Sequence, residues 1–429
     1  MIGKLDMADS GDKDDFPAVC RRLSAAFRHD LIQRAEEKFF RAQLLSVSTL
    51  SPADVVLFVT VASQLRRLLL SGERDSAEGT DTCRETTVQN RCSGRTWCEL
   101  LQGKIIATVF FEPSTRTRCS FEAATLRLGG QVISCGDMQT NSSTKKGESL
   151  EDSIRMFAAY SDCIVLRHPE KGSVERAAQA LKSVRRGRPP CALLSAGDGA
   201  GEHPTQALLD LLTLVQLRPL WWDAQLKKIE GDSSCVRGPG DRKAMEAGHQ
   251  PETSLRVAFV GDLKNGRTVH SLALLLSRFD CHLTTVSTES SALPPSVVAC
   301  VRENFKAQGL SEERLICSSD FHAAIQTSDV LYMTRLQSER LAEPVVTTPG
   351  HQFPPSDFQL TGELLEKHAR PHLKVMHPLP RREEIAVDVD DTDHCAYFAQ
   401  AENGLYMRMA LLAIFLNQRT ARLLLGEAS

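Results

Sequence analysis

The sequence predicts an α/β fold made of two doubly wound parallel-sheet domains, with the active site in the cleft between them. At 429 residues the chain is longer than one hydrophobic core usually supports, which favours two domains. From Lys104 onward, short apolar runs alternate with amphipathic segments, as strands and crossover helices do in a parallel sheet. Polar clusters follow most of these runs. Because open α/β sheets bind ligands beside the carboxyl ends of their strands, these clusters are the candidate site.

Composition limits the classes of partner. The net charge of −3 and the isoelectric point near 6.5 give no long-range field for nucleic acid or an anionic membrane. No apolar stretch reaches membrane-spanning length. The thirteen cysteines include no Cys-x-x-Cys pair, so zinc-ligand spacing is absent and a reducing compartment is indicated. The acidic segment 1–15 argues against a secretory signal or a transit peptide, which leaves a soluble cytoplasmic protein as the expectation.

The first hundred residues contain one clear helix between two segments of unassigned role. Residues 1–43 form an extension in which 21–41 could be a charged helix. Ser51, Pro52 and Asp54 provide a cap, a first-turn proline and an acidic third position, so a helix is expected from there to about Leu70. Residues 71–97 are rich in Ser, Thr, Gly and charge, which is typical of a solvated insertion.

The first domain is expected to span residues 44–217. Its four strands are expected at Ile105–Phe111, Gln131–Cys135, Asp162–Leu166 and Cys191–Ser195. The amphipathic helix Thr205–Leu217 should lead out of this domain.

The second domain is expected to span residues 218–402 and to begin with a flexible insertion at 219–254, where Trp221 and Trp222 are candidate packing anchors. Its strands are expected at Arg256–Val260, His282–Val286, Leu315–Ser318, Asp329–Met333 and Leu373–Met376. A final helix at 403–425 is apolar on several faces, which predicts that it is buried between other elements.

The stretch from Phe110 to Glu122 predicts an anion site. It is a strand, a tight turn and a helix start, and it contains Ser114, Thr115, Arg116 and Thr117. Free backbone N–H groups, the helix dipole, three hydroxyls and a guanidinium suit a phosphate dianion. The alternative is an ordinary capped helix with a solvated arginine, but a cap needs only one hydroxyl.

Two further clusters follow first-domain strands. Arg167 stands at a strand end, and His203 with Gln206 begins a helix, where the helix dipole lowers the pKa of an imidazole and keeps it a neutral donor. The loop at 141–149 holds Ser142 and Lys146, and taken alone it fits a charged solvated loop.

The second domain predicts a carboxylate site. Gly261–Thr268 lacks the Gly-x-Gly-x-x-Gly spacing of a dinucleotide site. Arg267 and Thr268, with Arg335 and Gln337, instead provide two guanidiniums that can clamp two carboxylates. The expected second substrate is therefore a dicarboxylate amine.

These motifs together resemble a known family. Ser-Thr-Arg-Thr-Arg followed by Ser-Phe-Glu is similar to the carbamoyl-phosphate signature of the transcarbamoylases, which include aspartate and ornithine enzymes. The Thr-Arg-x-Gln-x-Glu-Arg run from Thr334 and the His377–Pro380 run look like the aspartate branch. The ornithine branch usually has a cysteine in place of Pro378 and a Ser-Met-Gly loop, and this sequence has neither. The resemblance covers about residues 44–417.

The resemblance implies specific roles. Carbamoyl phosphate would be bound by Ser114, Thr115, Arg116, Thr117, Ser142, Lys146, Arg167, His203, Gln206, Pro378 and Leu379. Aspartate would be bound by Lys146, Arg267, Thr268, Arg335, Gln337 and Leu379. The catalytic set would be Arg116, Thr117, Lys146, Arg167 and His203.

The resemblance also implies the assembly and the reaction. Ser142 and Lys146 would reach into a neighbouring subunit of a homotrimer, so that the active site lies at the subunit interface, and Glu112 would pair with Arg267 and Arg340 as the domains close. The final helix would cross back to the first domain. The products would be N-carbamoyl-L-aspartate and phosphate, in pyrimidine synthesis, with no metal or redox cofactor. The alternatives are a carbamoyl-phosphate or phosphate-metabolite sensor without turnover, and a transferase for another amine such as ornithine.

Overall fold

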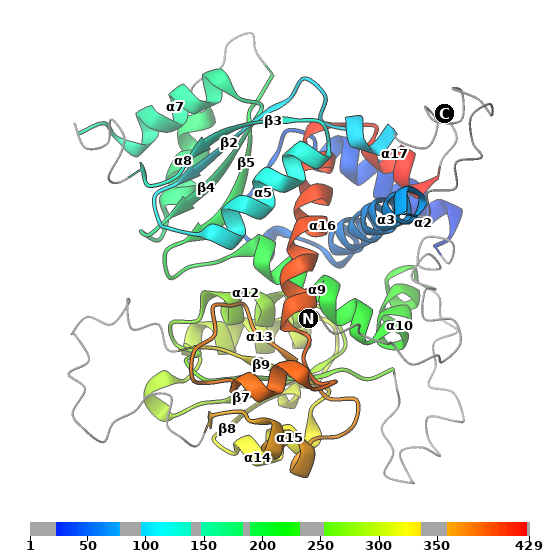
Figure 1. The fold of residues 1–429 in the computed structure, drawn as a ribbon, viewed down its shortest axis with the longest axis vertical. Helices are drawn as coiled ribbons and strands as arrows, with labels where there is room; N and C mark the ends of the chain where they lie inside the picture. Colours follow the sequence, from blue (N-terminus) through cyan, green and yellow to red (C-terminus); the bar gives the residue numbers. More distant parts are fainter. Residues whose placement is uncertain are drawn as a thin grey trace.

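Two parallel β-sheets, one above the other in Figure 1, form the framework of the protein. The computed structural model describes residues 23–77, 96–138, 147–182, 189–231, 253–335 and 358–426. Every strand pair in both sheets is parallel, which confirms the predicted fold class. None of the helices in these ranges combines the length and the apolarity that a membrane span requires.

The first sheet has the strand order β1-β5-β4-β2-β3. The central strands β2, β4 and β5 are buried on both faces, which explains their near-continuous apolar runs. Strand β1 is not predictable from the sequence, because its two residues give no periodic signal. The strands are β1 (Gln43–Leu44), β2 (Ile105–Phe110), β3 (Gln131–Cys135), β4 (Cys163–His168) and β5 (Ala192–Asp198).

The second sheet repeats this architecture with the order β10-β9-β6-β7-β8. Three of its strands have the predicted bounds, and the other two begin one residue later than expected. The strands are β6 (Arg256–Val260), β7 (His282–Val286), β8 (Leu315–Ser318), β9 (Val330–Met333) and β10 (Lys374–Met376).

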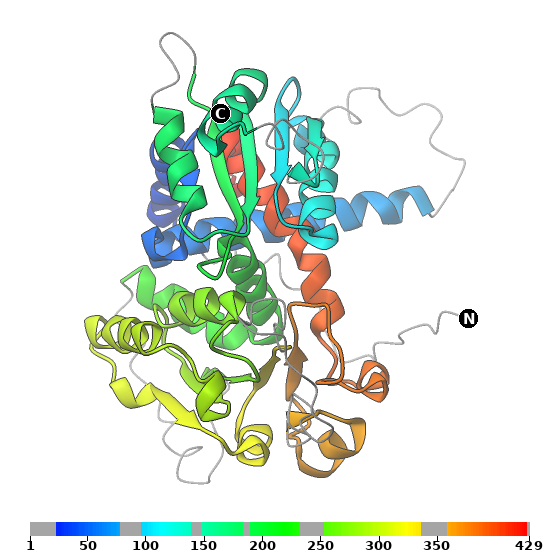
Figure 2. The ribbon, with the colours of Figure 1, turned by 90° about the vertical axis from the view of Figure 1, so that its left-hand side faces the viewer.

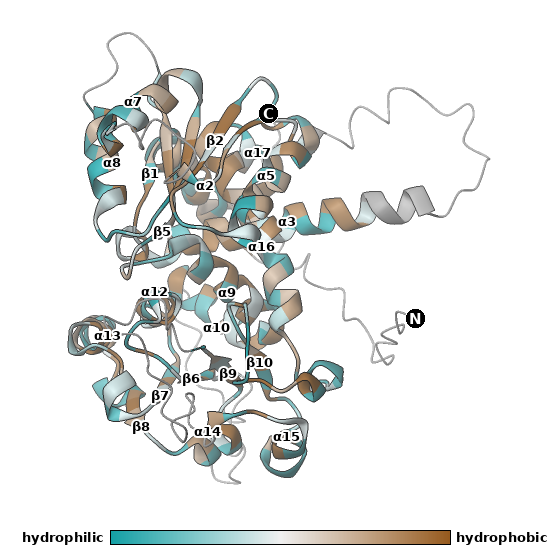
Figure 3. Cartoon of the chain, turned by 60° about the vertical axis from the view of Figure 1, so that its left-hand side comes forward, coloured by the Kyte–Doolittle hydropathy of each residue, from teal (hydrophilic) through white to brown (hydrophobic). Residues whose placement is uncertain are grey.

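Helices cover both faces of each sheet. Along β2, Ile106 packs into a core shared with α3, α5, α9 and α16, whereas Ala107 faces a separate core formed with α7 and α8. In the second sheet Val257 and Ala258 divide in the same way, toward α12 and α13 on one side and α14 and α15 on the other. Figure 3 shows brown, apolar residues along the strands of the upper sheet and a mixture of brown and teal along the helices. The helices are α2 (Ala25–Gln33), η1 (Arg34–Phe39), η2 (Val47–Thr49), α3 (Pro52–Ala77), η3 (Thr96–Glu99), α5 (Thr115–Arg127), α7 (Leu150–Tyr160), α8 (Ser173–Lys182), α9 (Pro204–Leu217), α10 (Pro219–Ile229), α12 (Arg267–Leu276), η5 (Glu289–Ser291), α13 (Pro295–Ala307), η6 (Glu312–Arg314), α14 (Phe321–Thr327), α15 (Gly362–His368), η9 (Val387–Asp391), α16 (Tyr397–Leu416) and α17 (Thr420–Leu425).

Helix α16 links the two sheets. It follows β10 of the second sheet and packs against α3, α5 and α9 beside the first sheet, and Figures 1 and 2 show it running between the two halves. The single helix predicted at 403–425 is wrong in its bounds, because α16 starts at Tyr397 and ends at Leu416 and α17 is separate. Asn417 interrupts the helix by donating from Nδ2 to Leu100 O at 2.9 Å and accepting from Arg419 N at 2.9 Å.

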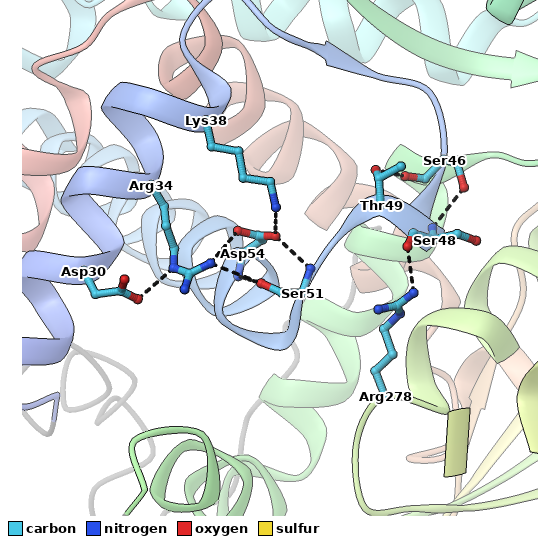
Figure 4. A network of polar contacts seen from close by, with 9 residues as sticks. All are labelled: Asp30, Arg34, Lys38, Ser46, Ser48, Thr49, Ser51, Asp54 and Arg278. Atoms are coloured by element: carbon cyan, nitrogen blue, oxygen red, sulfur yellow. Dashed lines mark hydrogen bonds and ion pairs between the residues drawn. The ribbon is translucent and has the colours of Figure 1, made fainter. Parts of the chain in front are cut away.

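The described part of the N-terminal extension is helical and contacts the first turn of α3. Ser51 and Asp54 form the predicted capping box, with Ser51 N donating to Asp54 Oδ2 at 2.7 Å and Asp54 N donating to Ser51 Oγ at 3.3 Å. Arg34 and Lys38 of η1 converge on the same buried carboxylate (Figure 4). The predicted charged helix is therefore α2 followed by η1, and two of its charged residues, Arg34 and Lys38, face a buried partner.

Two predicted insertions contain helix at their edges. Helix α3 continues to Ala77 instead of ending near Leu70. The expected flexible segment at 219–254 begins with α10, because Trp221, Trp222 and Leu226 form a buried apolar face at helical spacing. Trp221 also donates from Nε1 to Asp280 O at 2.8 Å, so both tryptophans are packing anchors as predicted. The remainder of both segments, at 78–95 and 232–252, lies outside the described residues.

Candidate active site

A cavity of about 710 Å³ lies where the carboxyl ends of the two sheets face each other. Side chains from both halves line it. They come from the end of β4, from the loops and helix starts that follow β2, β5, β6, β9 and β10, and from α16. This location agrees with the rule for open parallel sheets. The lining residues are Glu112, Pro113, Ser114, Thr115, Arg116, Thr117, Arg167, His203, Gln206, Leu209, Arg267, Thr268, Thr334, Arg335, His377, Pro378, Leu379, Pro380, Gln400, Ala401 and Arg408.

The N-terminus of α5 opens into this cavity. Ser114 is its N-cap residue, yet the Ser114 hydroxyl accepts no capping hydrogen bond from the helix. An ordinary cap would use that oxygen for the N–H of the second or third helical residue. Ser114, Thr115 and Thr117 therefore border the cavity beside N–H groups of the first turn, as an anion site requires.

Five arginines and one glutamate make up the charged lining among the described residues. Two of these arginines, Arg116 after β2 and Arg335 after β9, are close enough to influence each other. Desolvation, and then the charge of Arg335, lower the pKa of Arg116. Such an excess of positive charge in a partly desolvated space favours ligands that carry several negative charges.

Glu112 is the carboxylate that organises two of these guanidiniums. Its Oε2 lies 3.0 Å from Arg167 Nε and 3.1 Å from Arg267 Nη2. Arg267 also donates from Nη1 to Gly199 O at 2.6 Å. Gly197, at φ +126°, allows the guanidinium to pass, since a Cβ there would lie 3.2 Å from Arg267 Cζ. Arg267 is thus a fixed part of the cavity wall, held by groups from the first sheet.

His203 occupies the N-cap position of α9 and is 3% exposed. Burial lowers the pKa of His203 well below its usual value, and the charges of Arg267, Arg167 and Arg408 add to this effect. The sequence predicted the same direction from the helix dipole, whereas burial and the three guanidiniums are the causes in the structure. A neutral imidazole in this position can donate a hydrogen bond without adding another positive charge.

The loop after β10 closes the remaining side of the cavity. Leu379 N donates to His377 Nδ1 at 2.8 Å, which makes Nδ1 an acceptor and places the proton of the neutral ring on Nε2. His377 Nε2 lies 2.8 Å from Glu384 Oε1, so the buried carboxylate accepts that proton in a hydrogen bond. Leu379, which lines the cavity, has a positive φ of 55°. This left-handed backbone conformation is uncommon for a leucine, and such residues often lie at functional sites.

Most of the predicted site residues meet in this one cavity. They are Ser114, Thr115, Arg116, Thr117, Arg167, His203, Gln206, Arg267, Thr268, Arg335, Pro378 and Leu379. Ser142, Lys146 and Gln337 lie outside the described residues, as does Arg340. Sequence reasoning missed Gln400 and Arg408 on α16. The available signal was the presence of polar side chains at Gln400, Asn403 and Arg408 in a largely apolar helix.

Comparisons with known proteins agree on one family. The model of the aspartate/ornithine carbamoyltransferase carbamoyl-P binding domain matches residues 43–216, and that of the Asp/Orn binding domain matches residues 253–415. The aspartate carbamoyltransferase catalytic subunit of Chromobacterium violaceum is 42% identical over 320 residues, which cover 75% of this chain and 88% of that relative. The Vibrio vulnificus protein of the same name is 37% identical over 380 residues, which cover 88% of this chain and 98% of that relative.

Solved structures show the same likeness. The Trypanosoma cruzi aspartate transcarbamoylase in complex with carbamoyl phosphate and aspartate is 31% identical, with a TM-score of 0.68 over 89% of this chain and 98% of that chain. The catalytic subunit of M. jannaschii aspartate transcarbamoylase is 33% identical, with a TM-score of 0.61 over 86% of this chain and 96% of that chain. The chain therefore belongs to the aspartate/ornithine carbamoyltransferase family.

Proposed function

We propose that the protein is an aspartate carbamoyltransferase, which transfers the carbamoyl group of carbamoyl phosphate to the amino group of L-aspartate. The products are N-carbamoyl-L-aspartate and phosphate. The observation that carries the proposal is that one cavity combines the uncapped N-terminus of α5 with five guanidiniums and a neutral His203. The aspartate carbamoyltransferase names of the curated relatives support the same activity.

The phosphate end of the first substrate would lie at α5. Ser114, Thr115 and Arg116 contact the phosphate together with the first N–H groups of the helix, and Arg167 approaches from β4. Thr117, Arg167 and His203 face the carbonyl oxygen and stabilise the negative charge that develops there. Gln206 binds the amide of the carbamoyl group.

The aspartate carboxylates would be bound on the other side of the cavity. Arg335, after β9, is the principal partner, and Arg267 shares its guanidinium between Glu112 and the substrate. Leu379 and Thr268 complete this side, with Gln337 expected from the family resemblance. The amine attacks the carbonyl carbon and the bond to phosphate breaks. The departing phosphate takes the proton from the amine, so the protein supplies no nucleophile of its own.

Assembly, pathway and compartment belong to the same proposal. The protein would form a homotrimer in which Ser142 and Lys146 complete a neighbouring subunit's site, and would serve pyrimidine synthesis in the cytoplasm. Residues 44–217 with the final helices would form the carbamoyl-phosphate-binding domain, and residues 218–402 the aspartate-binding domain. The two family models support this division, since the first ends at residue 216 and the second begins at residue 253.

The deciding experiment offers carbamoyl phosphate to the purified protein with aspartate, with ornithine or with no amine, and measures phosphate release. We expect phosphate release in the aspartate arm and none in the other two arms. Release with ornithine would indicate the other branch of the family. Binding of carbamoyl phosphate without release in any arm would identify a sensor.

A further inference from the structure

Asp210 is a fully buried carboxylate directly behind the cavity, on α9 one helical turn after Gln206. Three side chains from three elements donate to it. Its Oδ1 accepts from Gln206 Nε2 at 2.9 Å and from Gln400 Nε2 of α16 at 2.6 Å. Its Oδ2 accepts from the hydroxyl of Tyr332, on β9, at 2.8 Å. The site chemistry described above makes no use of this carboxylate.

The orientation of both glutamine amides follows from hydrogen-bond complementarity. The backbone N–H of His377 lies 2.8 Å from Gln400 Oε1, and an N–H can donate only to the oxygen end of that amide. Gln400 must therefore present its NH₂ group to Asp210. The Oδ1 atom of Asp210 is then an acceptor, and Gln206 must present its NH₂ group to the same atom.

The other end of the Gln206 amide, its oxygen Oε1, is available to the cavity. Among the described residues no hydrogen bond uses Gln206 Oε1, and Gln206 lines the cavity. An amide oxygen in this position accepts a hydrogen bond from an N–H group of the ligand. In the reverse orientation the NH₂ group of Gln206 would face the NH₂ group of the carbamoyl group, and two donors cannot form a hydrogen bond. We infer that Asp210 is a positioning residue, which fixes the amide of Gln206 so that its oxygen selects a ligand bearing an N–H donor. This inference rests on the proposed function.

The surroundings of Asp210 keep Oδ1 an acceptor in either protonation state. Burial raises the pKa of Asp210 to about 7, although Gln400, Tyr332, Gln206 and the charge of Arg408 oppose this effect. A proton on Oδ2 can be donated to the Tyr332 hydroxyl, which leaves Oδ1 unchanged. Asparagine mimics that protonated form, because its NH₂ group can face Tyr332 while its oxygen faces the two glutamines.

The test compares Asp210→Asn and Asp210→Ala with the wild type, using carbamoyl phosphate and acetyl phosphate as ligands. Acetyl phosphate replaces the NH₂ group by a methyl group and so lacks the N–H donor. Binding is measured by calorimetry, and turnover by carbamoyl-aspartate formation. The wild type and Asp210→Asn should prefer carbamoyl phosphate by about tenfold or more. Asp210→Ala should bind the two ligands with nearly equal affinity and should lose about tenfold or more in kcat/KM for carbamoyl phosphate.

Thr213→Val is the matched control. Thr213 lies on the next turn of α9 and accepts from Asn403 Nδ2 of α16 at 3.0 Å, so the change removes a buried polar contact between the same two helices. It should lower stability and leave the ligand preference intact. A preference lost equally in Thr213→Val would mean that helix packing, and not Asp210, controls the site.

Two further measurements keep the inference separable from the proposed function. In the double variant Asp210→Ala with Gln206→Ala, kcat/KM should equal that of Gln206→Ala alone, and losses that multiply would overturn the inference. If the alanine variant does not fold, Asp210→Ser provides the same comparison, since serine lacks the carboxylate oxygen that accepts from Gln206 Nε2. A wild-type protein without turnover would reject the proposed function, whereas normal turnover with an unchanged preference in Asp210→Ala would reject only the role of Asp210.

Discussion

Glu112 Oε2 and Arg267 Nη2 form an ion pair of 3.1 Å that joins the end of β2 to the first turn of α12. The same oxygen lies 3.0 Å from Arg167 Nε, so one carboxylate fixes a guanidinium from each half of the protein. The predicted pairing of Glu112 with Arg267 is therefore present, while Arg340 lies outside the described residues. The pair connects the two halves of the protein across the cavity. A change in the separation of the two sheets would therefore change the positions of Arg167 and Arg267.

Replacing Glu112 by glutamine should lower kcat/KM for aspartate by about 2 kcal/mol, roughly 30-fold, because two charge-assisted contacts are lost together. The unfolding midpoint should change little, since Glu112 is partly exposed at the cavity and no apolar surface is uncovered. Steady-state kinetics and thermal unfolding measure the two effects. Glu151→Gln, which removes an exposed ion pair to Arg176, is the control and should leave kinetics unchanged.

The same variant tests closure of the two halves. The bisubstrate analogue N-(phosphonacetyl)-L-aspartate, bound in a Trypanosoma cruzi relative, should compact the wild type in small-angle scattering. Glu112→Ala should be compacted less, because the bridging carboxylate is absent. Equal compaction of both proteins would show that the ion pair does not hold the closed state.

Arg335→Ala should lower kcat/KM for aspartate by about 2 kcal/mol or more through the loss of a charge-assisted carboxylate contact. Carbamoyl phosphate should still bind, because the α5 N-terminus and Arg116 remain. Calorimetry with carbamoyl phosphate and kinetics with aspartate separate the two effects. Arg382→Ala, an exposed arginine outside the cavity lining, is the control. Unchanged aspartate kinetics in Arg335→Ala would remove this arginine from the substrate site.

His203 should remain neutral throughout the neutral pH range. Its pKa is lowered well below 6.5 by burial and by Arg267, Arg167 and Arg408, so the protonated form appears only at more acidic pH. His203→Ala should reduce kcat by about 100-fold, since one donor to the carbonyl oxygen is lost. The titration of the His203 ring, followed by NMR, checks the protonation state. A His203 resonance that titrates near pH 6.5 would contradict the expectation.

Asp54→Asn should destabilise the protein by about 2 kcal/mol at neutral pH, because a buried carboxylate with two basic partners and a backbone N–H donor is neutralised. Burial raises the pKa of Asp54, but the hydrogen bonds from Lys38 and Ser51 outweigh it and the net shift is downward. A lowered folded-state pKa stabilises the protein above the unfolded-state pKa, and the stabilisation is lost as pH falls through the folded-state pKa. Urea unfolding at several pH values should show the difference between variant and wild type shrinking below pH 4. A constant difference would contradict this assignment.

Mixing two inactive variants should restore activity if neighbouring subunits share each site. Lys146→Ala and Arg167→Ala chains are expected to be inactive alone, whereas random mixed trimers should regain about a quarter of their sites. Carbamoyl-aspartate formation is measured before and after the variants are dissociated, mixed and reassembled, with the wild type treated identically. No gain in verified mixed trimers would mean that Lys146 serves its own chain.

The sequence located the larger strands because both sheets are parallel and buried, so each strand is a short apolar run with a turn signal beside it. It could not find β1, whose two residues depend on pairing with β5. It assigned the start of α10 to a flexible insertion because residues 219–254 are long for a connection and carry many charges, while the burial of Trp221 and Trp222 depends on tertiary contacts. Local composition does not reveal such contacts.

The site was predictable where several polar residues share one loop. Ser114 to Thr117 and the residues around Arg167 and His203 form such clusters at strand ends. Asp210, Gln400 and Arg408 were not found, because they are scattered polar residues in largely apolar helices and only the packing of α9 against α16 brings them together. Likewise, the position of Arg267 in the cavity wall depends on Glu112 and Gly199, which are far from it in sequence.

The position of α16 affects the order in which the chain can fold during synthesis. The faces of α3, α5 and α9 that α16 covers belong to the first half of the chain, but α16 follows both sheets in the sequence. While the ribosome makes residues 218–396, those apolar faces have no permanent partner. A nascent chain of this length exposes aggregation-prone surface, and it should therefore bind a chaperone that recognises apolar segments until Tyr397–Leu416 emerges.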